Sequence, residues 1–425
     1  MLATRPRAVI VVTGSELVRG DRRDANGPYL ASQLVHLGAD PARILVVGDR
    51  PDELEAAIRE GLEADICVTS GGLGPTHDDR TVELLARAAG VPLHVDPSLE
   101  REIEVVSRRI AERLGRPYAD FATGVRKQAS LPDGAVALGL AGTAPGVVLA
   151  HDERVAVALP GPPPELRRLW PKAVESQALR RVLERARPRG HRVLRFFGPS
   201  ESAVARVLDE SGGEGEGLEV TVCARDFEIH VDLFCEEGAE ERRAAVEGAL
   251  LSEFGHQLFA EDGLPVEEIV LALAVARGLT LATAESCTGG MVSARLTDVA
   301  GASDAYLGGI VAYSNAVKTG QLGVPEEVLA RHGAVSAEAA AAMARGARAT
   351  LGADVAAAVT GIAGPGGGSP EKPVGLVFFH VDAPGASEAL DRELPGDREA
   401  VRAWSTALVL HLLRRVLSQS SDSSA

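Results

Sequence analysis

The sequence lacks the features expected of a secreted or membrane-spanning protein. It has four cysteines among 425 residues and no C-x-x-C pair, which indicates free thiols in a reducing compartment. No stretch approaches the roughly 18 uncharged apolar residues that a membrane helix requires. The first apolar run ends at Thr13 and Gly14, too early for a secretion signal. We therefore expect a cytoplasmic protein with no membrane partner.

Positive charge is also scarce. Acidic residues outnumber basic ones by 60 to 44, and the formal net charge is -16. Because nucleic-acid affinity depends largely on contacts between cations and phosphates, this balance argues against a direct nucleic-acid partner. It leaves room for a small local anion site. The length and the hydrophobic fraction of 45% suit two or three domains, each with its own core.

The first part of the chain alternates short apolar runs with segments of helical period. Short connections between such elements predict a parallel, three-layer α/β sheet. Ligands bind outside the carboxyl ends of the strands in such sheets, so the loops at 14–26 and 71–79 are candidate site loops. The expected strands are 7–13, 44–47 and 65–70, and the expected helices are 26–37, 51–62 and 81–89, with a basic loop at 126–128.

Two further parts follow. Residues 189–258 read as a small α+β insert with few chemically active side chains, and 259–264 reads as a linker. The strand–helix alternation then restarts, with a long final helix from about residue 397. We place the domains at 1–172, 173–258 and 265–418, and expect a disordered serine-rich tail at 419–425.

In the last domain, Ser286 lies in a glycine turn between an expected strand and helix. Its hydroxyl needs a base to become a nucleophile. The three histidines beyond residue 265 have no evident site context, whereas Lys318, expected at the end of a strand, is one of only two lysines there. Burial would lower its pKa toward neutrality and make it a general base. Two alternatives stay open: Cys287 as the nucleophile, or an ordinary tight turn with a solvated surface lysine.

The glycine-rich loops of the first domain suggest a phosphate site. Glycine turns with Ser and Thr hydroxyls can cradle phosphate oxygens, and paired carboxylates such as Asp78 and Asp79 can hold a divalent cation that bridges them. The alternative is a glycine turn in which one of these aspartates caps the following helix.

Several stretches together resemble the competence/damage-inducible CinA family. In the last domain they are TAESCTGG (283–290), AYSN with Lys318, HGAVS (332–336), TGIAGP (360–365) and EKPVG (371–375), in the family's order. The glycine loops of the first domain resemble the MoaB/Mog-like molybdopterin-binding fold. The resemblance implies two three-layer α/β domains, joined by a small α+β middle domain, in a homodimer.

For the C-terminal domain the resemblance implies an amidohydrolase that needs no cofactor and converts nicotinamide mononucleotide to nicotinate mononucleotide and ammonia. Ser286 would be the nucleophile and Lys318 its base, assisted through hydrogen bonds by Tyr313 and by Ser303, whose neighbours depart from the family's pattern. The residues implied in binding substrate or the developing oxyanion are Thr288, Gly289, Gly290, Thr360, Gly361, Ala363 and Arg398.

For the N-terminal domain the resemblance implies an ADP-ribose pyrophosphatase that forms AMP and ribose 5-phosphate with a divalent metal and potassium. Both substrates would be small nucleotides from NAD breakdown. The competing hypothesis is a non-catalytic pterin-binding or interaction protein linked to DNA uptake. The implied roles are metal binding by Glu16, Asp78 and Asp79 and phosphate contact by Ser15, Thr76 and Lys127.

Overall fold

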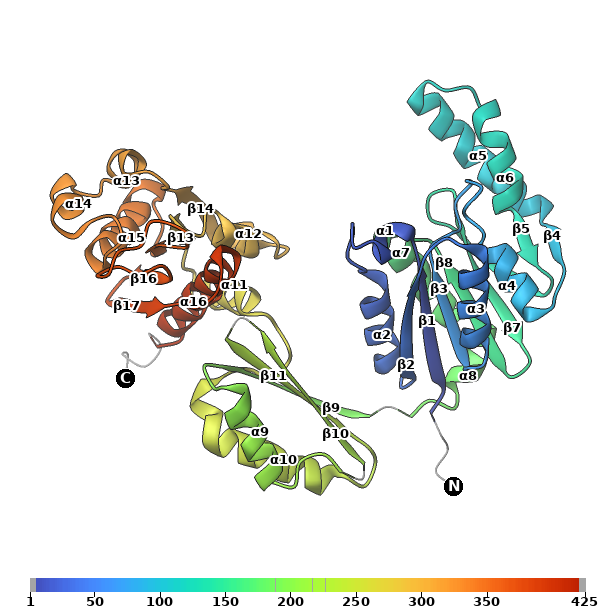
Figure 1. Cartoon of the computed structure of the whole chain (residues 1–425), viewed down its shortest axis with the longest axis horizontal. Helices are drawn as coiled ribbons and strands as arrows, with labels where there is room; N and C mark the ends of the chain where they lie inside the picture. Colours follow the sequence, from blue (N-terminus) through green and yellow to red (C-terminus); the bar gives the residue numbers. More distant parts are fainter. Residues whose placement is uncertain (1–4, 188, 216, 226, 420–425) are drawn as a thin grey trace. The chain divides into compact units, whose positions relative to one another are not determined.

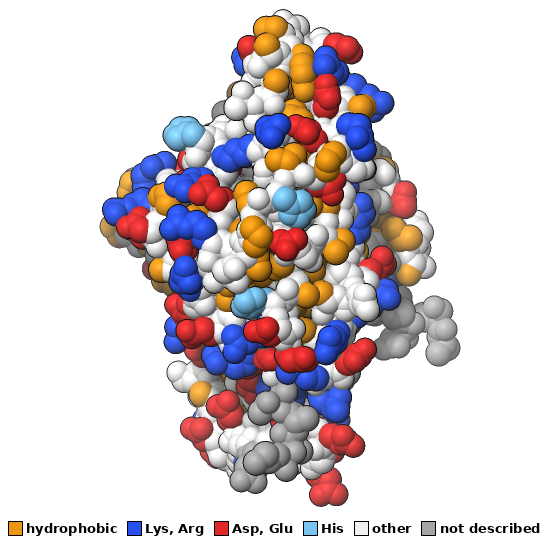
Figure 2. Space-filling view, turned by 90° about the vertical axis from the view of Figure 1, so that its right-hand side faces the viewer, with side chains coloured by type: hydrophobic (Ala, Val, Ile, Leu, Met, Phe, Trp, Pro, Cys, Tyr) orange, Lys and Arg blue, Asp and Glu red, His pale blue; other side chains and the backbone are white. Residues whose placement is uncertain are grey.

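The computed structural model describes residues 5–187, 189–215, 217–225 and 227–419, and the chain forms two compact units, Met1–Arg189 and Gly190–Ala425 (Figure 1). Within the described residues, no helix combines the length and apolarity needed to cross a membrane. The face drawn in Figure 2 carries acidic and basic side chains intermixed, without a continuous basic area. Residues 420–425 of the expected disordered tail lie outside the described residues.

The first unit is built on a six-stranded sheet in the order β2-β1-β3-β8-β7-β6. The strands expected at 7–13, 44–47 and 65–70 are parallel, as predicted, and β8 is parallel to β3. The strand β7 is antiparallel to both of its neighbours, so the sheet as a whole is mixed. The reason is the tight turn at Asp152, because a short hairpin can join only antiparallel strands. The strands are β1 (Arg7–Thr13), β2 (Asp40–Val47), β3 (Ile66–Ser70), β6 (Ala135–Leu140), β7 (Pro145–His151) and β8 (Arg154–Leu159), with a separate pair β4 (Leu93–Val95) and β5 (Ser130–Pro132).

Helices cover both faces of this sheet, which confirms the three layers. Side chains of β1 alternate between two cores: Val9 and Val11 pack with α3 and α4, while Ile10 packs with α2 and α7. The boundary expected at 172 falls inside α7, and α8 also packs on this unit's core. The predicted loop 126–128 is the end of α6. The helices are α1 (Ser15–Val18), α2 (Asn26–His36), α3 (Pro51–Leu62), α4 (Thr81–Ala89), α5 (Pro97–Leu114), α6 (Ala119–Gln128), α7 (Pro163–Glu175) and α8 (Gln177–Leu183).

The second unit begins with the α+β insert. Its antiparallel sheet has the order β10-β11-β9-β12, and both long helices share one apolar core with it. The predicted linker at 259–264 begins inside β12, which pairs with β9. The elements are β9 (Gly190–Phe197), α9 (Glu201–Glu210), β10 (Leu218–Arg225), β11 (Glu228–Cys235), α10 (Glu240–Phe254), the 3-10 turn η1 (Gly255–Gln257) and β12 (Leu258–Ala260).

The rest of the second unit is a five-stranded sheet in the order β14-β13-β15-β16-β17. The first three strands in this order are parallel, and β16 and β17 are antiparallel. The strands are β13 (Leu281–Glu285), β14 (Tyr306–Val311), β15 (Val355–Gly361), β16 (Leu376–Ala383) and β17 (Ala386–Glu393).

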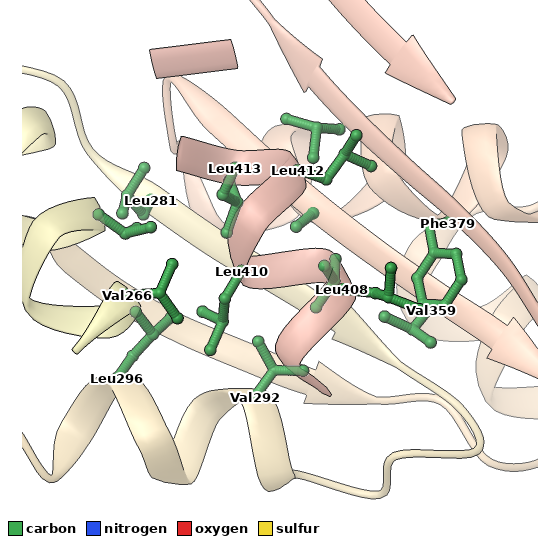
Figure 3. Packing of buried hydrophobic residues seen from close by; sticks show 14 of the residues in the cluster. Val266, Leu281, Val292, Leu296, Val359, Phe379, Leu408, Leu410, Leu412 and Leu413 are labelled. Atoms are coloured by element: carbon green, nitrogen blue, oxygen red, sulfur yellow. The ribbon is translucent and has the colours of Figure 1, made fainter. Parts of the chain in front are cut away.

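Helices again cover both faces of this sheet. On one face, Leu408, Leu410 and Leu413 of α16 pack between the sheet and the helices α11 and α12 (Figure 3). On the other face, α15 lies on the sheet, and Ser336 caps its start by accepting from the amide of Ala339. The helices are α11 (Val266–Ala276), α12 (Met291–Thr297), α13 (Asn315–Leu322), α14 (Glu326–His332), α15 (Ala337–Leu351) and α16 (Arg398–Gln419), with the 3-10 turn η2 (Ala302–Asp304).

Candidate active site

Ser286 follows the last residue of β13, in the middle of the parallel part of the second unit's large sheet. Its amide donates to the carbonyl of Val359 on β15 at 2.9 Å, which fixes the start of the turn. Gly289 and Gly290 have φ angles of 62° and 98°, a conformation that only glycine adopts without strain. The turn then enters α12. The strand–turn–helix placement predicted for Ser286 is confirmed.

Lys318 is the side chain that meets Ser286. Its Nζ lies 3.0 Å from Ser286 Oγ and donates to the carbonyl of Ala312 at 2.7 Å. The lysine is 2% exposed, and burial lowers its pKa. The expected position at a strand end is wrong: Lys318 lies in the first turn of α13, which Ser314 caps by accepting from the amide of Val317. The apposition of amine and hydroxyl, however, is as predicted.

Cys287, the alternative nucleophile, is buried in the core beside α16. Burial raises the pKa of its thiol to about 12. The thiolate is the nucleophilic form, so a thiol held protonated at neutral pH is inert. The geometry therefore favours Ser286 over Cys287.

The turn after Ser286 is held by Glu285, which sequence reasoning did not assign. This carboxylate is 1% exposed and accepts from the amides of Gly290, Val292 and Ser293 and from the Ser293 hydroxyl, at 2.6–3.1 Å. It therefore neutralises the positive start of α12. Because the Gly290 amide is already bonded, the prediction that it holds an oxyanion is wrong for this arrangement.

Arg398 and Tyr313 meet each other, not Ser286. Arg398 donates to the Tyr313 hydroxyl at 2.9 Å and to the carbonyl of Gly364 at 2.8 Å, and Tyr313 is 63% exposed. The predicted assistance of Ser286 by Tyr313 is therefore not seen; Tyr313 positions Arg398. A cavity of about 660 Å³ lies beside them, lined by Met291, Asp397, Arg398, Glu399 and Arg402.

Arg402 was missed by sequence reasoning. It donates from Nε to the carbonyl of Cys287 at 3.0 Å and from Nη2 to the carbonyl of Thr288 at 2.9 Å. Its position one helical turn after Arg398 was the available signal, since residues four apart share a helix face. Arg402 connects the cavity wall to the nucleophile turn.

Of the other residues predicted for this site, three lie in or beside the loop after β15, and Ser303 lies at the opposite end of the sheet. Thr360 is buried and donates to the carbonyl of Ala334, and Ala363 is buried in the core, so both support the loop beside the site. Gly361 ends β15 where a Cβ would meet Val377 and Leu376. Ser303 lies in η2, before the start of β14, while Ser286 follows the end of the neighbouring β13. Since these strands are parallel, the prediction that Ser303 assists Ser286 is wrong within one chain.

In the first unit, the two predicted loops line one cavity of about 640 Å³ at the carboxyl ends of the strands. Asn26 donates to the Ser70 hydroxyl at 2.9 Å and to the carbonyl of Gly161 at 2.7 Å, joining the cavity walls. Ser15, a predicted phosphate ligand, instead donates its hydroxyl to Asp49 at 2.6 Å. The loop geometry is therefore confirmed, while Ser15 serves to hold the loop.

The three residues predicted to bind metal, Glu16, Asp78 and Asp79, all line this cavity. The Thr76 hydroxyl lies within hydrogen-bond reach of both aspartates and donates its one proton to either of them. Lys127 donates to the carbonyl of Thr76, so Thr76 and Lys127 are engaged within the loop rather than facing the cavity. Among the described residues, no group of three His, Cys, Asp or Glu side chains is arranged to hold a metal ion. The predicted metal set does not converge here.

Comparison with known proteins agrees with this architecture. The CinA C-terminal domain family matches residues 264–417, and the probable molybdopterin binding domain family matches residues 9–181. A CinA-like protein of Mycolicibacterium gilvum (strain PYR-GCK) is 46% identical over 97% of this chain and 99% of its own. One from Mycobacterium tuberculosis (strain ATCC 25177 / H37Ra) is 41% identical over 98% of this chain and 99% of its own. The chain belongs to the CinA family.

Solved structures of CinA proteins are also similar to part of this chain. The competence/damage inducible protein CihA from Agrobacterium tumefaciens is 41% identical and covers 36% of this chain and 96% of its own, with a TM-score of 0.35. A CinA superfamily protein from Klebsiella pneumoniae 700603 is 36% identical and covers 36% of this chain and 99% of its own, also with a TM-score of 0.35. In this CinA-family chain, the Ser286–Lys318 pair falls in the matched C-terminal domain and the loop-lined cavity in the matched N-terminal one.

Proposed function

We propose that the C-terminal domain hydrolyses the carboxamide of nicotinamide mononucleotide to nicotinate mononucleotide and ammonia. The observation that carries this proposal is the 3.0 Å separation of Ser286 Oγ from the buried Nζ of Lys318. A buried amine without a carboxylate partner is readily neutral, and a neutral amine beside a hydroxyl is a general base. Ser/Lys pairs of this kind are one of the variants of nucleophilic hydrolysis.

The chemistry runs in two halves. In the first, Lys318 takes the proton of Ser286 as Oγ bonds to the carboxamide carbon, and the carbonyl oxygen becomes an oxyanion. Lys318 then returns the proton to the amide nitrogen, the C–N bond breaks, and ammonia leaves an acyl ester on Ser286. In the second half, Lys318 takes a proton from water, hydroxide adds to the ester, and Ser286 leaves with that proton. The product is a carboxylic acid, which ionises.

The cavity lined by Arg398 and Arg402 supports a phosphorylated substrate. These two arginines line its wall together with Asp397 and Glu399. Because Arg402 is already bonded to the carbonyls of Cys287 and Thr288, Arg398 is the guanidinium left for a phosphate. A guanidinium can make two parallel hydrogen bonds to a phosphate, which makes arginine well suited to hold a nucleotide's phosphate group. We therefore assign the phosphate of the substrate to this cavity, with its amide directed toward Ser286.

The test is ammonia release from nicotinamide mononucleotide. We expect release by the wild type and a loss of about 10³-fold or more in kcat for Ser286→Ala, because the nucleophile is removed. Ser303→Ala is the matched control: it removes a serine hydroxyl outside the pair and is expected to keep wild-type kcat. A silent wild type would instead favour the non-catalytic alternative, a pterin-binding or interaction protein.

For the N-terminal domain we propose hydrolysis of ADP-ribose to AMP and ribose 5-phosphate in the loop-lined cavity. Six carboxylates line this cavity against two arginines, Arg22 and Arg23. A diphosphate would be repelled by this wall unless cations accompany it. That charge balance supports the proposed need for a divalent metal and potassium, but the carboxylates do not converge on a metal here, so we derive no step through one.

The N-terminal proposal is tested by AMP formation from ADP-ribose with and without a divalent cation and potassium. We expect cation-dependent product in the wild type and a loss of about 10²-fold in Asp79→Ala. Unchanged activity in that variant would remove the site from these loops. A cytoplasmic location and a homodimer complete the proposal; light scattering of the full chain tests the dimer.

A further inference from the structure

Arg402 and Glu285 both bind the backbone of the turn at 286–290, Arg402 through its carbonyls and Glu285 through its amides. Arg402 binds two carbonyls of the turn, those of Cys287 and Thr288, while Glu285 binds the amide of Gly290 and two amides of α12. A cation therefore takes the backbone acceptors and an anion takes the backbone donors. Each peptide plane between Cys287 and Gly290 is consequently fixed in direction.

The direction of the amides follows from peptide geometry. In a planar trans peptide, the C=O of one residue and the N–H of the next point to opposite sides. Because the guanidinium of Arg402 holds the carbonyls of Cys287 and Thr288, the amides of Thr288 and Gly289 point away from it. These are the second and third amides after the nucleophile's own, and backbone N–H groups are common donors to an oxyanion.

Among the described residues, neither the Thr288 amide nor the Gly289 amide donates to a backbone or side-chain oxygen. The Thr288 amide has only the Cys287 sulfur beside it, a weak acceptor. The next amide, that of Gly290, is taken by Glu285 at 2.9 Å. The amides of Thr288 and Gly289 are thus the donors left for an oxyanion, because the Gly290 amide is bonded to Glu285.

We infer that Arg402 is a positioning residue of the proposed amidohydrolase site, which aims the amides of Thr288 and Gly289 at the oxyanion of the acyl-transfer step. The inference rests on the proposed function and assigns the oxyanion site to these two amides and not to Gly290. Arg402 acts through the backbone, whereas its neighbour Arg398, whose guanidinium meets Tyr313 and the carbonyl of Gly364, is left to bind the phosphate.

The two arginines provide a matched comparison, because they lie one turn apart on α16 and line the same cavity. An oxyanion donor acts mainly in the transition state, while a phosphate contact acts equally in the ground state. We expect Arg402→Gln to lower kcat by about 10- to 100-fold with KM within about threefold of wild type. That loss lies below the roughly 10²–10³-fold loss for removing a donor outright. We expect Arg398→Gln to raise KM with little change in kcat.

Two further variants separate positioning from a loss of folding. Arg402→Lys keeps the charge but cannot reach both carbonyls as a planar fork, so its kcat should stay below that of wild type. In Arg402→Ala, added guanidinium ion should restore part of kcat through the open cavity, while added methylammonium should not. Arg415→Gln, near the far end of α16 in a half-exposed ion pair with Glu388, is the control expected to keep wild-type kcat and KM.

The outcomes are distinct. A raised KM with unchanged kcat in Arg402→Gln would show that Arg402 binds substrate and would overturn the positioning role. Full activity in Arg402→Gln beside an active wild type would overturn it as well, leaving the proposed function intact. An inactive wild type would overturn the proposed function and this role together. An Arg402→Ala variant that folds, by its thermal midpoint, but is not rescued by guanidinium would also contradict the inference.

Discussion

His411 Nε2 lies 2.8 Å from Glu228 Oε1, although 183 residues separate the two in the chain. The contact joins the last helix, α16, to strand β11 of the insert. The ring of His411 stacks on Phe197 with centroids 3.7 Å apart, and His230 donates to the second oxygen of Glu228. The Nδ1 atom of His411 is buried without a partner, so a second proton on the ring would have no acceptor.

This pair makes the second unit sensitive to acid. Burial lowers the pKa of His411 from 6.5 to about 4. Burial alone would raise the pKa of Glu228, but the hydrogen bonds from His230 and His411 lower it to about 2. In both cases the unfolded chain binds more protons than the folded one, so the free energy of unfolding falls as pH falls, from about 6.5 to 4 for His411 and from about 4.5 to 2 for Glu228.

Urea unfolding of the wild type and His411→Gln between pH 7 and pH 4 measures this effect. Glutamine can still donate to Glu228 but does not titrate, so we expect the variant to lose less stability than wild type over that range. His256→Gln, at an exposed histidine of the same unit, is the control and should follow the wild type. Parallel curves for wild type and His411→Gln would rule out His411 as the acid-sensitive group.

The second prediction concerns the pH dependence of amide hydrolysis. The active form of Lys318 is the unprotonated amine, and burial lowers its pKa. We expect kcat/KM to rise with pH and to level off at a midpoint below 10.5, the ordinary lysine value. Initial rates of ammonia release across pH 5–10 would show it. A rate that still climbs in proportion to hydroxide up to pH 10 would mean that Lys318 is not the base.

The third prediction separates catalysis from stability at the same residue. Lys318→Met should abolish ammonia release, because the base is gone, and should raise the thermal midpoint at pH 7. The unfolded chain holds the Lys318 proton more tightly than the folded one, so at neutral pH this lysine opposes folding, and the apolar side chain removes that opposition. Lys372→Met serves as the comparison: that amine donates to the carbonyls of His332 and Val335, so its loss should lower the midpoint.

Local signals in the sequence were enough for much of the fold. The period of 3.6 and the flanking Pro and Gly residues placed α3 and α4 with their observed ends, Pro51–Leu62 and Thr81–Ala89. The strand β17 was missed because Ala386–Glu393 alternates exposed polar residues on an edge strand. The strand β7, Pro145–His151, was not among the expected strands, and its direction depends on its pairing partners, which the local pattern does not show.

In the candidate site, too, local sequence signals identified some residues, and residues whose role depends on tertiary contacts were missed. Ser286 and Lys318 were predictable because a glycine turn after a strand and a scarce lysine are visible in the sequence. The roles of Glu285 and Arg402 were not, because both act by binding backbone groups, and the backbone offers the same groups at every residue. The prediction that Ser303 assists Ser286 was wrong because a position in a motif does not show at which end of a strand the residue lies.

The last prediction tests how α13 is held with Lys318 on its first turn. Gly346 of α15 faces the end of α13 so closely that a Cβ would come within 1.9 Å of the carbonyl oxygen of Leu322. Gly346→Ala should therefore push α13 away, at a cost of about 1–3 kcal/mol in the free energy of unfolding. Because Lys318 moves with α13, kcat for amide hydrolysis should fall as well. Gly320→Ala, in α13 itself, meets no atom within 4 Å and should stabilise the chain by about 0.4–1 kcal/mol with unchanged kcat. Equal stabilities and rates for the two variants would show that α13 does not depend on this contact for its position.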